Sequence, residues 1–184
     1  MRDIVIAPVS HNRLRDWPAG HYAQLIGLLL DRIDASDRIS VVGTRGQRLA
    51  SDAIVRTHPV TRVANLCGTM PWPEVLALIG RARCVIGNNS GITHVSRQQG
   101  VPTVCIFGGS HQRTEWGPLG SSAMILSRAT ACSPCHLNHV WECPYGVACL
   151  ADIAPEEVAR AVLAAMRTHD AATGALDDER RVPC

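Results

Sequence analysis

The sequence predicts an α/β protein with a doubly wound parallel sheet, and two observations lead to that prediction. Apolar runs typical of buried parallel strands recur along the chain, and segments with apolar residues at helical spacing lie between them. This alternation of strands and helices requires parallel strands joined by right-handed crossovers. The 184 residues suffice for one Rossmann-like domain of this kind and are too few for two.

The first half of the chain supplies three strands, each followed by a helix. We expect the strands at residues 4–7, 39–42 and 63–66. Pro18 suits the first turn of a helix that continues to about Ile33. The next helix includes residues 49–55, and the third covers residues 71–82, where apolar side chains again repeat at helical spacing.

The second half repeats the pattern with strands at residues 84–86, 103–107 and 123–126. A helix over residues 95–99 ends at Gly100, and another helix follows Pro155. We therefore expect a folded domain over residues 1–168, including a Cys-rich segment at residues 130–150. Residues 169–184 are rich in Ala, Asp and Arg and are predicted to form a disordered tail.

A polar turn follows the fourth predicted strand, and we call residues 87–94 the fourth-strand turn. Its strand, turn and helix order presents unpaired backbone N–H groups and the positive end of a helix dipole. Ser90 and Gly91 are small enough to let an anion such as phosphate approach closely. The alternative is an ordinary helix cap, with Asn89 or Ser90 satisfying those N–H groups and no ligand present.

The expected strand order brings a second polar stretch to the same place. In a doubly wound sheet the first and fourth strands are neighbours, and ligands bind beyond their carboxyl ends. The first loop, residues 8–18, should therefore bring its residues 10–15 beside residues 89–94 of the fourth-strand turn, across one crevice. Arg13 or Arg15 would offset the charge of an anion there, although either one alone is equally well explained as a solvated charge.

Composition excludes several functions. All 18 basic side chains are arginine, so neither Schiff-base chemistry nor a lysine P-loop is available, and no GxGxxG follows the first strand. We expect no organic cofactor. The net charge of +2 with no basic run argues against nucleic acid, and no apolar run reaches transmembrane length. Met1 to Asp3 lead straight into a strand without a signal peptide, so we expect a cytoplasmic protein with reduced cysteines.

Several short motifs follow one another with the spacing of glycosyltransferase family 9, which includes the ADP-heptose:lipopolysaccharide heptosyltransferases. The chain resembles that family over nearly all residues up to the helix after Pro155, but only over the C-terminal half of such an enzyme. The residues that carry the resemblance are Pro8, residues 15–18 (RDWP), 65–69 (NLCGT), 87–94 (GNNSGITH), 100–102 (GVP), 107–109 (FGG) and 116–118 (WGP).

The resemblance implies a role for individual residues. Ser10 and His11 match loop residues that contact the donor diphosphate, and Arg15 matches a basic residue, commonly Lys, that offsets phosphate charge. The diphosphate and sugar would be held by Ser90, Gly91, Ile92, Thr93 and His94. Asn89 departs from the family, which usually has Asp there, and this change weakens the case for an unchanged donor or for activity.

The resemblance also implies a GT-B architecture with two Rossmann-like domains. The nucleotide-sugar donor, ADP-heptose or another NDP-sugar, would bind this domain, whereas the acceptor and the catalytic base would belong to an N-terminal domain or partner chain. No residue here convincingly supplies that base. The alternative is a binding or assembly module that has lost transfer activity. An epimerase of related architecture would need catalytic carboxylates that this chain does not display.

The Cys-rich segment contains a CxxC motif and two further cysteines. Four thiolates at such spacing can surround one metal ion, with His136 or His139 able to replace one of them, and the spacing does not separate zinc from iron. Free or disulfide-paired thiols are the alternative. In the autotransporter branch of the family, the comparable cysteines hold iron. The predicted ligands of a structural metal are Cys132, Cys135, Cys143 and Cys149.

Overall fold

The computed structural model of the protein describes residues 3–118 and 120–179. Its six strands form one parallel sheet in the order β3-β2-β1-β4-β5-β6, which confirms the doubly wound α/β fold. β1 and β4 are neighbours, as predicted, with Ile4 aligned with Cys84 and Ala7 with Gly87. The strands are β1 (Asp3–Ala7), β2 (Arg38–Val41), β3 (Val63–Asn65), β4 (Cys84–Asn88), β5 (Thr103–Phe107) and β6 (Ala123–Ser127).

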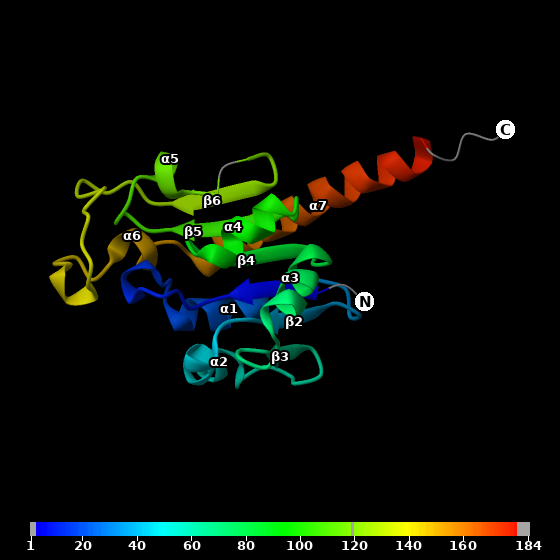
Figure 1. Ribbon diagram of the computed structural model, residues 1–184, viewed down its shortest axis with the longest axis horizontal. Helices are drawn as coiled ribbons and strands as arrows, with labels where there is room; N and C mark the ends of the chain where they lie inside the picture. The colour runs from blue at the N-terminus through cyan, green and yellow to red at the C-terminus, as the bar shows by residue number, and fades with distance from the viewer. Residues whose placement is uncertain (1–2, 119, 180–184) are drawn as a thin grey trace.

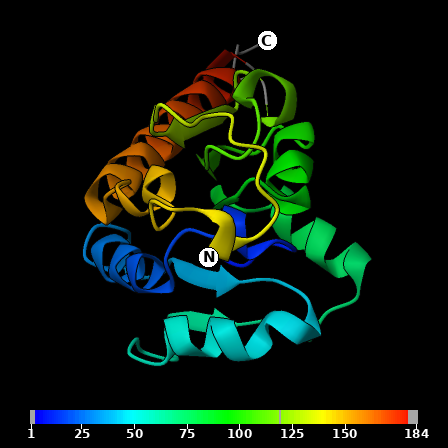
Figure 2. The same cartoon turned by 90° about the vertical axis from the view of Figure 1, so that its left-hand side faces the viewer.

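Helices cover both faces of the sheet (Figure 1). One face carries α1 (Ala19–Leu30), α2 (Arg48–Val55) and α7 (Pro155–Glu179), and the other carries α3 (Trp72–Gly80) and α4 (Gly91–Gln98). The connections contain the short helices α5 (Arg113–Trp116) and α6 (Ala148–Ala151) and the 3₁₀ turns η1 (Arg13–Arg15), η2 (Arg45–Gln47) and η3 (Val140–Glu142). In Figure 2 the carboxyl ends of the strands face the viewer, and the connections that follow the strands lie on this near side.

The alternation of side chains along β1 divides the core into two layers. Ile4 and Ile6 are fully buried against α1 and α7, whereas Val5 and Ala7 pack against α3 and α4. A strand covered on both faces buries most of its side chains, so apolar residues predominate on both faces. This explains the continuous apolar runs from which the sheet was predicted.

Helix α7 extends beyond the point where the sequence analysis ended the folded domain. Residues 169–179, assigned to a disordered tail, are helical, and residues 180–184 of that tail lie outside the described residues. Asp170 explains part of the extension, because its carboxylate pairs with Arg83 at 2.7 Å, and Arg83 also pairs with Asp37. Within the described residues, no helix has the length and apolar character to cross a membrane.

Asn88, the last residue of β4, fixes the first loop to the sheet. Its side chain is fully buried, and its Oδ1 accepts hydrogen bonds from the Trp17 amide (3.0 Å) and the Tyr22 hydroxyl (2.9 Å). Its Nδ2 donates to Pro8 O (2.8 Å) and to Asp16 Oδ1 (3.1 Å). The two ends of the first loop are therefore tied to the end of β4 through one amide.

We expect Asn88→Ala to lower the free energy of unfolding by about 3 kcal/mol, because the truncation leaves several buried polar groups without partners. Asn65→Ala is the matched control at the end of β3. Its amide donates to Arg48 O and Asp52 Oδ1 and accepts from the Cys67 amide. Because Asn65 is only half-buried, water can replace these partners, and its loss should cost only about 1 kcal/mol. Urea unfolding of both variants measures the difference, and equal losses would contradict the role assigned to Asn88.

Candidate functional site

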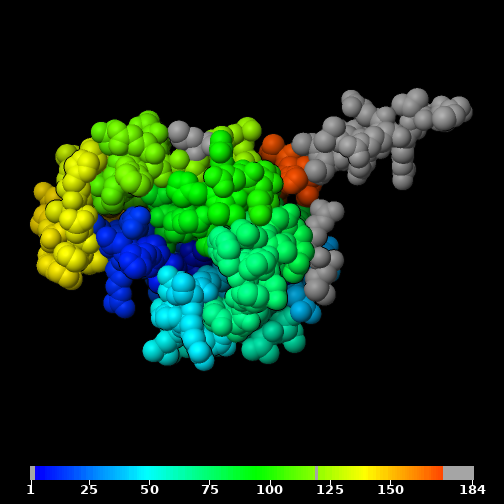
Figure 3. Space-filling view, in the orientation of Figure 1, coloured from blue at the N-terminus to red at the C-terminus, as the bar shows by residue number. Residues whose placement is uncertain are grey.

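A pocket of about 460 Å³ opens at the carboxyl ends of β1, β2 and β4. It is visible as a hollow between the first loop and the segments around α2, α3 and α4 (Figure 3). Ser10 and Gly91 line it together, so the prediction that the first loop and the fourth-strand turn share one crevice is confirmed. The other lining residues are Ala7, Val9, His11, Val42, Gly43, Thr44, Arg45, Gln47, Gly68, Met70, Trp72, Val75, Ser90 and Ile92.

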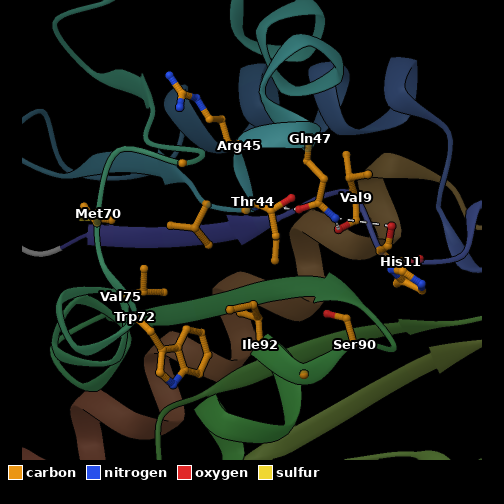
Figure 4. Close-up of a pocket in the computed structure, with 16 residues that line it drawn as sticks. Val9, His11, Thr44, Arg45, Gln47, Met70, Trp72, Val75, Ser90 and Ile92 are labelled. Atoms are coloured by element: carbon orange, nitrogen blue, oxygen red, sulfur yellow. Dashed lines mark hydrogen bonds between the residues drawn. The ribbon is translucent and has the colours of Figure 1, made fainter.

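The pocket has an apolar part and a polar part (Figure 4). Met70, Val75 and Trp72 gather at one end, and the indole of Trp72 is about half exposed. His11 and Ser90 lie at the other end, next to the first turn of α4. A ligand that fills the pocket must therefore combine a flat or apolar group with a polar or charged one.

The polar part is formed by the N-terminus of α4. Ser90 occupies the N-cap, and its amide donates to Thr93 Oγ1 at 3.3 Å. Ser90 Oγ is buried and faces the Thr93 amide in a capping-box arrangement, but it forms no well-aligned hydrogen bond among the described residues. A β-carbon added to Gly91 would meet no atom within 4 Å, so space is open directly above the first turn. The small residues and the open space at this helix end favour an anion.

The first loop is shaped mainly by its own hydrogen bonds. The Ser10 amide donates to Asp16 Oδ1 at 2.7 Å, and the Ser10 hydroxyl donates to Asn12 O at 2.6 Å. Gln47 supports the loop from the β2–α2 connection, because its Nε2 donates to Val9 O at 3.0 Å. Burial raises the pKa of Asp16, although the hydrogen bonds from Ser10 oppose that shift.

The cations of the site differ from the sequence expectation. Arg15 does not line the pocket; its Nε is buried without a partner, and its charge helps to lower the pKa of His111, which burial lowers most. Arg45 lines the pocket instead, with its side chain directed away from Ser90 in Figure 4. Sequence reasoning missed Arg45, Gln47 and Trp72. The sequence could have indicated Arg45 and Gln47, because they follow β2, and β2 lies beside β1 in a doubly wound sheet.

The rest of the fourth-strand turn lies behind the pocket. Thr93 is fully buried, and the single proton of its hydroxyl lies within reach of Ser90 O (2.8 Å) and Asn88 O (3.1 Å). Asn89 is buried, and its Oδ1 lies 3.0 Å from His94 Nε2. Burial lowers the pKa of His94, and the charge of Arg97 lowers it further. These side chains shape the turn that carries Ser90 and Gly91.

The Cys-rich segment forms a second cavity of about 390 Å³, lined by Cys132, Cys135, Cys143 and Cys149. The Gly109 amide donates to Cys149 Sγ at 3.3 Å, and the Val147 amide donates to Cys143 Sγ at 3.4 Å. Burial raises the pKa of Cys149, and the other three thiols raise it further. Nevertheless, no three His, Cys, Asp or Glu side chains among the described residues already stand as a metal-ligand cluster. The four thiols line one cavity, but among the described residues they do not form a metal-binding cluster.

Comparison with known proteins gives a family match. Residues 2–144 match the family model of glycosyltransferase family 9 (heptosyltransferase). The lipooligosaccharide heptosyltransferase 2 of Haemophilus ducreyi is 25% identical over 115 residues, which are 60% of this chain and 32% of that protein.

Solved structures agree in fold. The ADP-heptose lipopolysaccharide heptosyltransferase II of Escherichia coli superimposes with a TM-score of 0.75 at 21% identity, over 92% of this chain and 47% of that one. The dodecameric iron-containing heptosyltransferase TibC of enterotoxigenic E. coli, solved with ADP-D-β-D-heptose, gives 0.67 at 18% identity, over 91% of this chain and 46% of that one. The chain thus spans about half the length of the structures it matches.

The lowered pKa of His94 predicts that its ring is neutral at pH 7. Since the folded-state pKa lies below the unfolded value, this group should destabilise the fold as the pH falls below about 6.5. Asn89→Asp should raise the pKa of His94 because a carboxylate would then face Nε2. NMR titration of the imidazoles tests this, with His58 as the ring outside the site. A His94 pKa that does not rise in the variant would contradict the geometry.

Proposed function

This chain belongs to glycosyltransferase family 9, and we propose that its pocket binds the nucleotide-sugar donor, with ADP-heptose as the first candidate. The observation that carries the proposal is the open N-terminus of α4, where Ser90 and Gly91 line a pocket shared with the first loop. TibC, a structural neighbour, was solved with ADP-D-β-D-heptose.

The two parts of the pocket suit the two ends of a nucleoside diphosphate. The diphosphate would lie over Ser90 and Gly91, where backbone N–H groups and the helix dipole stabilise negative charge. The base would occupy the apolar part beside Met70 and Val75, with the exposed ring of Trp72 available for stacking. The cavity of about 460 Å³ is within the usual range for small-molecule sites.

The same geometry would assist sugar transfer. When the bond between sugar and diphosphate breaks, negative charge grows on the leaving nucleoside diphosphate, and fixed N–H donors at α4 would stabilise it. His11, which lines the pocket, would add to this from the first loop, as the family resemblance implies, whereas Arg15 lies outside the lining. A base for the acceptor hydroxyl would come from an N-terminal acceptor domain or a partner chain. The acceptor would be a glycan or a protein.

A binding or assembly module without transfer activity is the second candidate, and Asn89 is the observation that favours it. Its amide sits where the family usually has a carboxylate, and its Oδ1 faces the His94 ring. Binding of ADP-heptose without transfer in the presence of an acceptor domain would favour the module. In either case the donor pocket would be occupied.

Gly91→Ala tests the diphosphate position. The added methyl meets no protein atom and replaces glycine within a helix, so the melting temperature should stay the same or rise slightly. It would occupy the space above the helix end, so ADP affinity should fall about tenfold or more, a change of at least about 1.4 kcal/mol. Isothermal titration calorimetry with ADP and ADP-heptose measures the loss.

Gly20→Ala in α1 is the matched control, since its β-carbon also meets nothing within 4 Å and it does not line the pocket. Its ADP affinity should equal that of the unmodified protein. The donor assignment fails if folded protein binds neither nucleotide at millimolar concentration, or if both variants bind equally well.

We further propose that the Cys-rich segment holds one structural metal ion, zinc or iron, in a reducing compartment such as the cytoplasm. Four thiols around one cavity and two N–H···S hydrogen bonds support this. Because no ligand cluster is already assembled among the described side chains, the thiols would have to turn toward one another as the ion binds. The ion would cross-link a segment with little apolar core of its own.

Elemental analysis of protein purified under reducing conditions should find about one zinc or iron per chain. Cys135→Ser should lower that content and make residues 130–150 more susceptible to proteolysis. Cys184→Ser, outside the segment, is the control and should retain the metal. A metal content near zero, with two disulfides found by mass spectrometry, would overturn this assignment.

A further inference from the structure

The Cys-rich segment contacts the first loop directly (Figure 3). Asn12 Nδ2 donates a hydrogen bond of 2.9 Å to the backbone oxygen of Asn138, across 126 positions of sequence. Leu14 makes a second connection, because this buried side chain lines the same cavity as the four cysteines. Two segments that lie far apart in the sequence are therefore joined at the edge of the site.

Asn12 is also the residue that organises the first loop. Its Oδ1 accepts from the Leu14 amide at 2.9 Å and caps η1. Its backbone oxygen accepts from the Ser10 hydroxyl at 2.6 Å and from the Arg15 amide at 2.9 Å. The shape of the loop that carries Ser10 and Arg15 thus depends on a residue whose remaining side-chain nitrogen is held by the Cys-rich segment.

The acceptor side of this contact is itself fixed. Glu142 Oε2 accepts from the amides of Asn138 (2.8 Å) and His139 (3.0 Å), and these bonds lower the pKa of Glu142. Residues 135 and 136 anchor the segment to the loop after β5, since their amides donate to Gly109 O at 2.9 Å and Ser110 O at 3.1 Å. The backbone oxygen of Asn138 therefore lies in a turn that these hydrogen bonds hold in place.

We propose that Asn12 is a positioning residue through which the Cys-rich segment holds the first loop ready for the nucleotide diphosphate. The proposal rests on the donor-binding function given above. A loop that is already ordered loses less conformational entropy when the ligand binds, so a contact that orders it raises affinity without touching the ligand. Because such coupling acts in both directions, nucleotide binding should stabilise the ordered conformation of residues 138–142 by the same free energy.

Two variants break the contact from opposite sides. Asn12→Ser keeps a hydroxyl that can cap the Leu14 amide, but it is too short to reach Asn138 O. Glu142→Ala releases the turn that presents Asn138 and lies in the Cys-rich segment rather than in the donor pocket. Each should weaken ADP binding about fivefold, within the range expected for one hydrogen bond. The double variant should lose little more than either single variant, because both remove the same link.

The controls separate positioning from general destabilisation. Glu156→Ala removes an exposed carboxylate in the first turn of α7 and should leave ADP affinity unchanged. Melting temperatures show whether the variants remain folded at the assay temperature. Additive losses in the double variant, or an unchanged affinity in folded Glu142→Ala protein, would overturn the proposal.

Hydrogen exchange tests the link without any nucleotide. Glu142→Ala should accelerate exchange of the Leu14 and Arg15 amides, both of which bond to Asn12, while the amides of α4 keep their rates. Unchanged rates at Leu14 and Arg15 would refute the coupling. Faster exchange together with no ADP binding by the unmodified protein would instead leave the coupling intact and remove the donor function.

Discussion

The buried amide of Asn88 is the constraint on which the site depends. It bonds Pro8 and Asp16 with its nitrogen and Trp17 and Tyr22 with its oxygen, so the end of β4 determines where the first loop can lie. A buried amide of this kind is stabilising only when its donors and acceptors are all satisfied together. The loop is therefore held in one arrangement by the same strand whose following helix presents the open N-terminus.

The lining of the pocket comes from the connections that follow four neighbouring strands. The turn after β4 supplies the anion-binding helix end, the loop after β1 supplies Ser10 and His11, and the connections after β2 and β3 supply the apolar wall with Met70 and Trp72. A ligand is expected at this place in a doubly wound sheet. The connections that follow β1 and β4 leave the sheet toward opposite faces, so a crevice stays open between them beyond the strand ends. Ser90 and Gly91 bring the N-terminus of α4 to this pocket.

The Cys-rich segment extends this arrangement beyond the sheet. It is braced by Glu142 at one end and by the backbone of Gly109 and Ser110 at the other, and it reaches the first loop through Asn12. A segment whose apolar core is small can thus still influence the site, provided that its own order is maintained. Its four thiols line one cavity. A bound metal ion or a disulfide there would have the greatest effect on the order of the segment.

The sequence by itself determined the strands, the strand order and the meeting of Ser10 with Gly91, because buried parallel strands require continuous apolar runs and the crossover rule leaves few topologies. Only the tertiary structure decided which side chains face the pocket. Arg15 lies outside the pocket lining while Arg45 is part of it. The Thr93 hydroxyl bonds backbone oxygen, and Asn12 bonds a residue 126 positions away. The repeat of apolar residues within a segment indicates whether that segment is a helix or a strand. The direction of a side chain in a loop depends instead on partners that are distant in the chain.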